Sequence, residues 1–290
     1  MGIFDQNNNS SSGGFSGRFI SALLIVVLGL FMYFCQEQEN PVTGEQQHVS
    51  ISPSEEIKLG LQSAPAMSQK MGGELSASDP RAQEVKKMGA FLVTHTVASH
   101  SPWKFQFHLL ADTKMINAFA LPGGQVFITL GLLNALQTEA QLAGVLSHEM
   151  GHVIERHSAQ QIAKGQLGAL LVSAVTVAST DPQNREGAYA PAVIASVVNQ
   201  MAQLRYSRKD ESQADEWGLK LMTESGYDPR AMIEVMKILK SSGGKESSPE
   251  IFQTHPNPDL RIKQIEAYLE QHPPAQGLRE GRKLKEVFGS

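Results

Sequence analysis

The chain has 290 residues, of which 41% are hydrophobic, and this length and composition suffice for one substantial folded core. The formal net charge is −4 and the basic residues are scattered, which excludes the basic face that binds nucleic acid. Cys35 is the single cysteine, so a metal site made of thiolates is excluded as well.

The N-terminal residues are expected to form an appendage to this core. Residues 1–18 are rich in Asn, Ser and Gly, a composition typical of disorder. Residues 19–35 form an uncharged apolar run, which favours an uncleaved transmembrane signal anchor over a cleaved signal peptide or a core helix. Arg18 precedes the run and Glu37 and Glu39 follow it, a charge bias that places the N-terminus in the cytoplasm. We therefore expect a single-pass membrane protein whose main domain is periplasmic or otherwise extracytoplasmic.

The remaining patterns predict a mainly helical α+β domain with a small β-sheet. Capping residues followed by proline or glutamate mark helix starts, and alternating apolar side chains indicate strands. The predicted helices cover residues 53–71, 79–99, 228–240 and 258–271, and the predicted strands cover residues 105–110 and 125–129. The domain would extend over residues 40–272, with a C-terminal tail over residues 273–290.

Two apolar segments, residues 167–178 and 188–198, are each shorter than the roughly 18 residues that a membrane span needs. We interpret them as buried or cleft-lining helices, with an interfacial or re-entrant position as the alternative. The stretch 241–248 is interpreted as a flexible loop.

Residues 148–152 read His-Glu-Met-Gly-His, the feature that says most about chemistry. In a helix, His148 and His152 lie on one face one turn apart, so both imidazoles can bind one zinc ion, with Glu149 placed beside them as a base. The alternative is a solvated helical turn with two ordinary histidines. Apolar residues recur at three- and four-residue steps from Leu142 to Val153, which indicates a core-facing helix and favours the metal site.

A catalytic zinc site normally has three protein ligands, so the chain must supply one more. Glu211 is the best candidate, because Asp215 follows it by four residues on the same helical face. Asp215 can then accept the second ring N–H of a metal-binding histidine and hold it in place. The alternative is an exposed charged helix, but two like charges four residues apart are mildly destabilising without a cation between them.

With these elements in place, the chain resembles the gluzincin zinc metallopeptidases of the HtpX and CAAX prenyl endopeptidase family, in particular the bacterial branch of BepA (YfgC)-like and YggG-like peptidases. The resemblance extends from about residue 40 to residue 270 and includes separated motifs in the order found in the family. These motifs are Asn40-Pro41-Val42-Thr43-Gly44, residues 117–124 (Asn-Ala-Phe-Ala-Leu-Pro-Gly-Gly), residues 148–158, residues 207–215 and Thr254-His255-Pro256-Asn257-Pro258.

The resemblance implies a zincin (gluzincin) fold over residues 40–272 with one Zn2+ per chain. It makes His148, His152 and Glu211 the zinc ligands and Glu149 the general base. It further implies that His255 contacts the transition state, that Arg261 contacts a carboxylate in the substrate-binding site, and that Asn117 opens the substrate-binding edge strand. We expect an extended peptide to bind by adding to residues 126–129 of that edge.

The expected function is a membrane-anchored zinc endopeptidase that hydrolyses misfolded or misassembled envelope proteins in protein quality control. The alternative is a chaperone-like protein of the same fold that holds its clients and whose proteolysis is latent. The expected partners are polypeptide substrates and a membrane, and nucleic acid is not expected to bind. The sequence leaves the oligomeric state open, and a homo-oligomer is one alternative.

Overall fold

The computed structural model describes residues 13–167, 189–242 and 249–288. The described α-helices are α1 (Gly13–Cys35), α2 (Pro53–Lys70), α3 (Pro80–Thr94), α4 (Leu130–Ala135), α5 (Glu139–Ile154), α7 (Tyr189–Ala202), α8 (Arg208–Glu224), α9 (Ala231–Ser242), α10 (Ile251–Thr254), α11 (Pro258–Gln271) and α12 (Leu284–Phe288). Short 3-10 helices are η1 (Val97–His100) and η2 (Pro122–Gly124), and the strands are β1 (Glu37–Glu39), β2 (Gln46–His48), β3 (Gln106–Leu110), β4 (Ala118–Leu121) and β5 (Gln125–Thr129). The mainly helical α+β class predicted from the sequence is confirmed.

The domain contains a three-stranded sheet in the order β3-β5-β4. β5 is parallel to β3 and antiparallel to β4, with Val126 opposite Phe107 on one side and Ala120 on the other. Both backbone edges of β5 are therefore occupied, and the prediction that residues 126–129 form the substrate-binding edge is wrong. The edge strand that follows Asn117 is β4.

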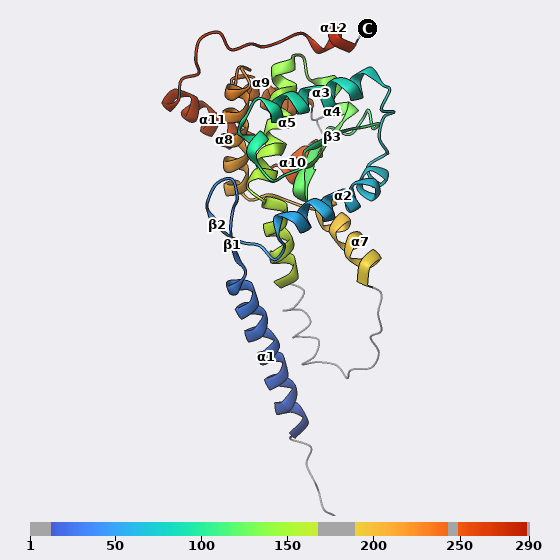
Figure 1. Cartoon of the computed structure of the whole chain (residues 1–290), viewed down its shortest axis with the longest axis vertical. Coiled ribbons are helices and arrows are strands. Elements are labelled where there is room, and N and C mark those ends of the chain that lie inside the picture. The colour runs from blue at the N-terminus through green and yellow to red at the C-terminus, as the bar shows by residue number, and fades with distance from the viewer. Residues whose placement is uncertain (1–12, 168–188, 243–248, 289–290) are drawn as a thin grey trace, which may run out of the picture.

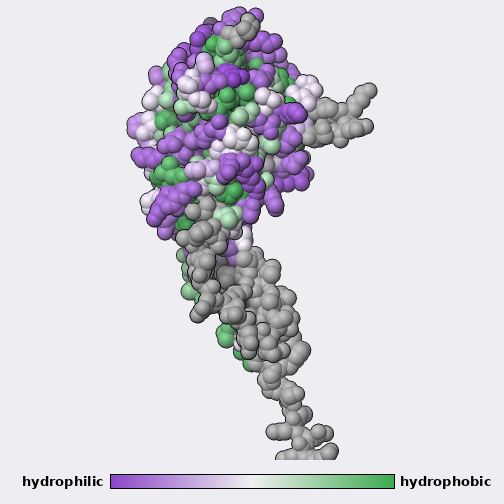
Figure 2. All heavy atoms as spheres, turned by 90° about the vertical axis from the view of Figure 1, so that its right-hand side faces the viewer, coloured by the Kyte–Doolittle hydropathy of each residue, from purple (hydrophilic) through white to green (hydrophobic). Residues whose placement is uncertain are grey.

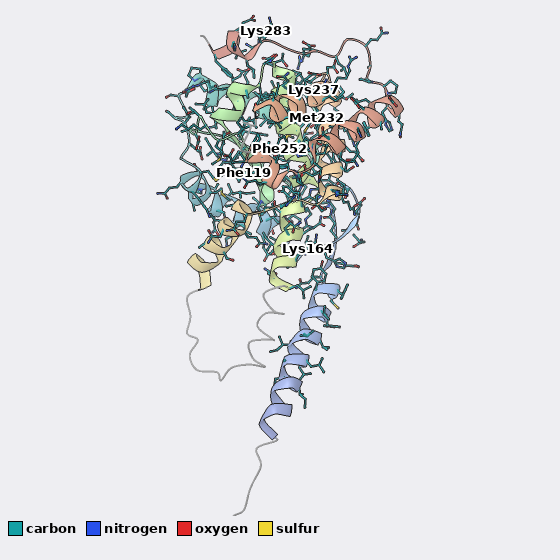
Figure 3. The ribbon with its side chains drawn as sticks, turned by 180° about the vertical axis from the view of Figure 1, so that it is seen from behind. Phe119, Lys164, Met232, Lys237, Phe252 and Lys283 are labelled. Carbon is teal, nitrogen blue, oxygen red and sulfur yellow. The ribbon has the colours of Figure 1, made fainter. Side chains whose placement is uncertain are left out.

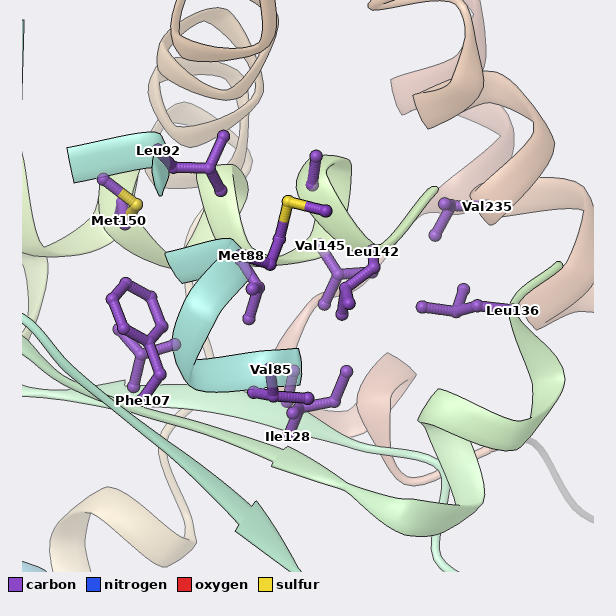
Figure 4. Packing of buried hydrophobic residues seen from close by; sticks show 14 of the residues in the cluster. Val85, Met88, Leu92, Phe107, Ile128, Leu136, Leu142, Val145, Met150 and Val235 are labelled. Carbon is purple, nitrogen blue, oxygen red and sulfur yellow. The ribbon is translucent and has the colours of Figure 1, made fainter. Parts of the chain in front are cut away.

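Helix α5 lies at the centre of the domain, and all of its residues are buried. It packs most extensively on α8, and also on α9, α3 and β4. A helix that is covered on every side needs apolar residues all round. Figure 4 shows how Leu142, Val145 and Met150 of α5 contribute to the core together with Val85 of α3 and Ile128 of β5.

The start of α5 is determined locally. Thr138 is its N-cap, and the side chains of Thr138 and Gln141 bind each other's backbone N–H in a capping box. The cap fixes where α5 begins, and His148 and His152, four positions apart in it, lie on one face of the helix.

The N-terminal helix extends away from the domain (Figure 1). It begins at Gly13, so residues 13–18 are helical where the sequence predicts disorder, while residues 1–12 lie outside the described part. Among the described residues, no helix is both long and apolar enough to cross a membrane. This finding contradicts the predicted single-pass anchor at residues 19–35 and the extracytoplasmic location derived from it. The face of the domain in Figure 2 is mostly hydrophilic, with scattered hydrophobic residues.

The C-terminal residues pack onto the domain instead of forming a separate tail. Leu284 is 1% exposed, and the backbone of Arg282 accepts a hydrogen bond from the N–H of Glu139 at the start of α5. Figure 3 labels Lys283 in this segment, at the end of the molecule opposite α1. The apolar segment 167–178 lies almost entirely outside the described residues, as does most of the loop 241–248. The segment 188–198 falls within α7 apart from its first residue, so the helix predicted there is confirmed, and Val198 is buried in it.

Candidate metal centre

Helix α5 presents two histidines whose ring nitrogens meet. Nε2 of His148 lies 3.1 Å from Nε2 of His152, one helical turn on. Both side chains are buried, at 6% and 1% exposure. The face predicted from the four-residue spacing is therefore formed, and its imidazoles are shielded from water.

Helix α8 brings a carboxylate to the same point. Ser207 caps this helix in a capping box with Asp210, which directs Glu211 toward α5. Oε1 of Glu211 lies 3.5 Å from Nε2 of His152, and Oε2 lies 3.7 Å from Nε2 of His148. Close packing of the two helices is helped by Gly151, where a Cβ would lie only 2.8 Å from the carbonyl oxygen of Ala214.

His255, which follows α10, completes the cluster. Its Nδ1 lies 3.0 Å from Oε1 of Glu211 and 3.3 Å from Nε2 of His148. Potential ligand atoms of His148, His152, Glu211 and His255 all lie within 4.8 Å of one another and could hold a metal ion. The structure thus brings together residues that are 107 positions apart in the chain.

Asp215 and Arg261 support the cluster from outside. Oδ1 of Asp215 lies 2.9 Å from Nδ1 of His148, the contact expected from the sequence. Arg261 of α11 donates from Nε to Oδ2 of Asp215 at 2.8 Å, and its Nη1 lies 2.7 Å from Oε2 of Glu211. The guanidinium is 3% exposed and both of its carboxylate partners belong to the protein, an arrangement that differs from the substrate contact predicted for Arg261.

Glu149 lies beside the cluster on the same turn of α5. Its side chain is 1% exposed, its Oε1 is 3.6 Å from Nε2 of His255, and its Oε2 has no hydrogen-bond partner in the described part of the chain. Burial raises the pKa of this carboxyl group, against the opposing effect of His255 and His148. A buried carboxylate with a free oxygen is suited to exchange a proton with a bound molecule.

The charges of the other groups follow from their neighbours. Burial opposes ionisation of Glu211, but Arg261 and His255 outweigh it and hold the pKa of Glu211 well below its usual value. The same balance between burial and Arg261 lowers the pKa of Asp215. Burial also lowers the pKa of His152 well below its usual value, which favours the neutral imidazole that a metal requires.

Two aromatic neighbours of His152 were not predicted as site residues. The ring of Tyr206 stacks on His152 with 3.8 Å between the ring centroids. Nδ1 of His157 lies 2.9 Å from Nδ1 of His152. His157 belongs to the motif that extends the pentad, which was a usable signal, whereas Tyr206 stands 54 positions after His152 and leaves no trace in local spacing.

Asn117 directly precedes β4, not the strand at residues 126–129 where the substrate edge was predicted, and its side chain makes no hydrogen bond to the cluster among the described residues. Its backbone pairs with Thr129, and its Oδ1 is buried without a hydrogen-bond partner in the described part. Asn117 is thus placed at the start of the edge strand and not at the reacting groups.

An apolar cavity adjoins Glu149, His148 and His255 between α5 and α9. Its apolar wall is formed by Gly144, Val145, Met232, Val235, Met236 and Leu239. Figure 3 labels Met232 within this part of the domain. The cavity is small, about 20 Å³, which is room for about one water molecule.

Comparison with known proteins identifies the family. Residues 79–269 match the model of peptidase family M48. The chain is 29% identical over 265 residues to the mitochondrial metalloendopeptidase OMA1 of Schizosaccharomyces pombe, covering 91% of this chain and 74% of that protein. It is 30% identical over 186 residues to the beta-barrel assembly-enhancing protease of Escherichia coli, covering 62% of this chain and 37% of that protein.

A third relative, the mitochondrial metalloendopeptidase OMA1 of Danio rerio, is 28% identical over 254 residues, covering 85% of this chain and 53% of that protein. The chain thus spans about half or less of the length of the bacterial and zebrafish relatives. The matched family model nevertheless covers most of the chain and includes every residue of the cluster. The chain therefore belongs to peptidase family M48 and is a metalloendopeptidase.

Proposed function

We propose that the metal is Zn2+, one ion per chain, with His148, His152 and Glu211 as its ligands. The observation that carries this proposal is the 3.1 Å approach of the two Nε2 atoms. Nδ1 of His148 faces the acceptor Asp215, so it carries the proton, and Nε2 is left with a lone pair. A lone pair directed at a second imidazole and at a carboxylate needs a cation between them, and two imidazoles with one carboxylate are a donor set typical of catalytic zinc.

Zinc in such a site polarises the scissile carbonyl and increases the acidity of water. Glu149 takes the proton of the attacking water and delivers it to the leaving amine, for which its free Oε2 and raised pKa are suitable. His255 is the proposed donor to the oxyanion, because its Nε2 is buried, has no hydrogen-bond partner among the described residues and faces Glu149.

The proposed substrate is an extended polypeptide that adds to the edge of β4 opposite β5, an edge with which no strand of the described residues pairs. This strand lies against α5, so an added strand would place its backbone near the cluster, with main-chain hydrogen bonds that tolerate many sequences. The apolar wall that Met232 and Met236 form beside Glu149 would contact an apolar side chain of the substrate next to the scissile bond. Misfolded chains expose such side chains, which supports a role in protein quality control.

The name of the Escherichia coli relative connects it with β-barrel assembly, and this supports misassembled envelope proteins as the substrate class. It also supports the BepA-like branch within family M48, while the wider HtpX and CAAX assignment stays a prediction. The chaperone-like alternative is favoured by the near-complete burial of the cluster, because substrate must displace covering residues before it is cleaved.

The test compares wild type with Glu149→Gln and Glu211→Ala, by elemental analysis and by hydrolysis of an unfolded protein such as casein. Wild type should bind about one zinc and cleave. Glu149→Gln should keep the zinc and lose about three orders of magnitude in turnover, whereas Glu211→Ala should lose most of the metal. Full zinc retention in Glu211→Ala would contradict the ligand assignment. The chaperone alternative would be favoured if wild type did not cleave the unfolded protein and if wild type and Glu149→Gln suppressed its aggregation equally.

A further inference from the structure

His157 makes a chain of hydrogen bonds that the proposed mechanism does not use. Its Nδ1 lies 2.9 Å from Nδ1 of His152, and its Nε2 lies 3.3 Å from Oε1 of Gln213 on α8. The side chain is 1% exposed, and a buried imidazole with partners at both nitrogens has a defined orientation.

This chain of contacts determines which nitrogen of each ring carries the proton. Oε1 of Gln213 only accepts, so Nε2 of His157 donates to it and Nδ1 of His157 is left as an acceptor. Nδ1 of His152 must then donate to His157, which leaves the lone pair of His152 on Nε2. That is the nitrogen that points at His148 and Glu211.

The backbone that carries His157 is held in an uncommon conformation. Arg156 has φ of 58°, in the left-handed region that few non-glycine residues adopt. Its guanidinium is buried, with Nε 2.7 Å from Oε1 of Glu56 and Nη2 2.8 Å from the carbonyl oxygen of Ile51. Such a conformation persists only where its surroundings enforce it, and here α2 and the segment before it do so.

Strands β1 and β2 pair in an antiparallel N-terminal hairpin, residues 37–48, which holds the same turn from a second side. Nδ2 of Asn40 donates to the carbonyl oxygen of Ile154 at 2.8 Å, and Nε2 of Gln47 donates to that of Glu155 at 3.0 Å. These bonds satisfy carbonyl groups that the end of α5 leaves without helical partners. Asn40, Gln47 and Glu56 precede residues 79–269, so the support for this turn lies outside the segment that matches the family model.

We propose that His157 is a positioning residue for the metal centre, which fixes the orientation and the proton position of His152 as Asp215 does for His148. Arg156, held by α2 and the N-terminal hairpin, presents His157 to His152. The inference rests on the proposed zinc site. The inference adds that the proposed ligand His152 is oriented by a neutral imidazole acceptor, whereas His148 is oriented by the carboxylate of Asp215.

The test measures the zinc dissociation constant by competition with a chelator, for the full chain and for His157→Leu and His157→Asn. The Leu variant removes the acceptor, and we expect about 10- to 100-fold weaker zinc binding, the usual effect of losing an outer hydrogen bond to a ligand. The Asn variant places a carbonyl oxygen near the position of Nδ1, so zinc binding should return to within about threefold of wild type. Melting temperatures of the metal-free proteins are recorded in parallel.

Thr96→Val is the matched control, because Thr96 lies between α3 and η1, away from the cluster. The substitution removes a buried hydrogen bond, 2.7 Å from Oγ1 of Thr96 to the carbonyl oxygen of Leu92. It should lower the melting temperature and leave zinc affinity unchanged. If His157 had only a structural role, His157→Leu would also lower the melting temperature and leave zinc affinity unchanged. That result would overturn the inference. Absence of zinc binding by wild type would instead contradict the proposed zinc site itself.

Discussion

At the scale of single residues, the balance of buried charge around the cluster decides its stability. Glu149, Glu211 and Asp215 are carboxylates at 1%, 1% and 3% exposure, and Arg261 is the guanidinium that contacts two of them. Burying a charge without a partner is costly, whereas a paired charge with good hydrogen bonds is tolerated. Arg261 is therefore required to assemble the site, whatever the substrate contributes.

Arg261→Met tests this role. Removing the guanidinium leaves Glu211 and Asp215 without their cation, and we expect a loss of about 3–5 kcal/mol in the free energy of unfolding of the metal-free protein. Denaturant unfolding measures it, and zinc affinity should fall as well because Glu211 and Asp215 are no longer held. A variant with normal stability and zinc content but a raised KM would instead support the substrate contact predicted from the sequence.

At the scale of secondary-structure elements, short caps and docked segments hold α5 in place. Asp79 caps α3, which packs against α5, and its carboxylate accepts from the backbone N–H of Arg81 at 2.8 Å and from Nη2 of Arg81 at 2.7 Å. These hydrogen bonds from Arg81 lower the pKa of Asp79 from 3.8 to about 2.

This lowered pKa predicts a dependence of stability on pH. The folded protein binds the Asp79 proton less readily than the unfolded chain, so the stabilisation is present above about pH 4 and is lost as pH falls toward 2. The difference in unfolding midpoint between wild type and Asp79→Asn should shrink over that interval, since Asn keeps the cap but not the charge. A difference that stays constant from pH 5 to about pH 2.5 would contradict the assignment.

The C-terminal segment is a second element that holds α5. Leu284→Ala should lower the free energy of unfolding by about 2–5 kcal/mol, because Leu284 is 1% exposed and its truncation leaves a cavity in the core. Lys285→Ala is the control, since this neighbour is exposed and should change stability by less than about 0.5 kcal/mol. Equal midpoints for the two variants would mean that the segment does not stay docked in solution.

At the scale of the whole molecule, the metal centre connects parts of the chain that are far apart in sequence. α5 supplies His148 and His152, α8 supplies Glu211, and the segment after α10 supplies His255. A ligand that binds only the folded arrangement of these elements stabilises the entire domain by mass action.

Chelation should therefore lower the melting temperature of the wild-type protein. Free zinc at 1,000 times its dissociation constant contributes about 4 kcal/mol, and a chelator removes this contribution. Scanning calorimetry with and without the chelator should show the same shift for Glu149→Gln, which keeps the ligands, and almost none for Glu211→Ala. A shift of equal size in Glu211→Ala would mean that the stabilising ion is bound elsewhere.

The sequence by itself determines the features that depend on local spacing. His148 and His152 are four positions apart, Glu149 precedes His152 by three, and Glu211 and Asp215 are four apart, each set on a single helix. Helical geometry places residues at steps of three or four on one face in any context. Helix α11 also matches its predicted bounds, because Pro258 suits the first position of a helix, where its missing N–H would have no helical partner.

Only the tertiary structure decides the features that depend on contacts between distant segments. It makes β5 the central strand, gives Arg261 two protein carboxylates, stacks Tyr206 on His152 and docks Leu284 in the core. Strand order, ion pairing and docking are chosen by the packing of the complete chain. Residues separated by tens of positions carry no periodic signal of their contact, so these features could not be read from the sequence.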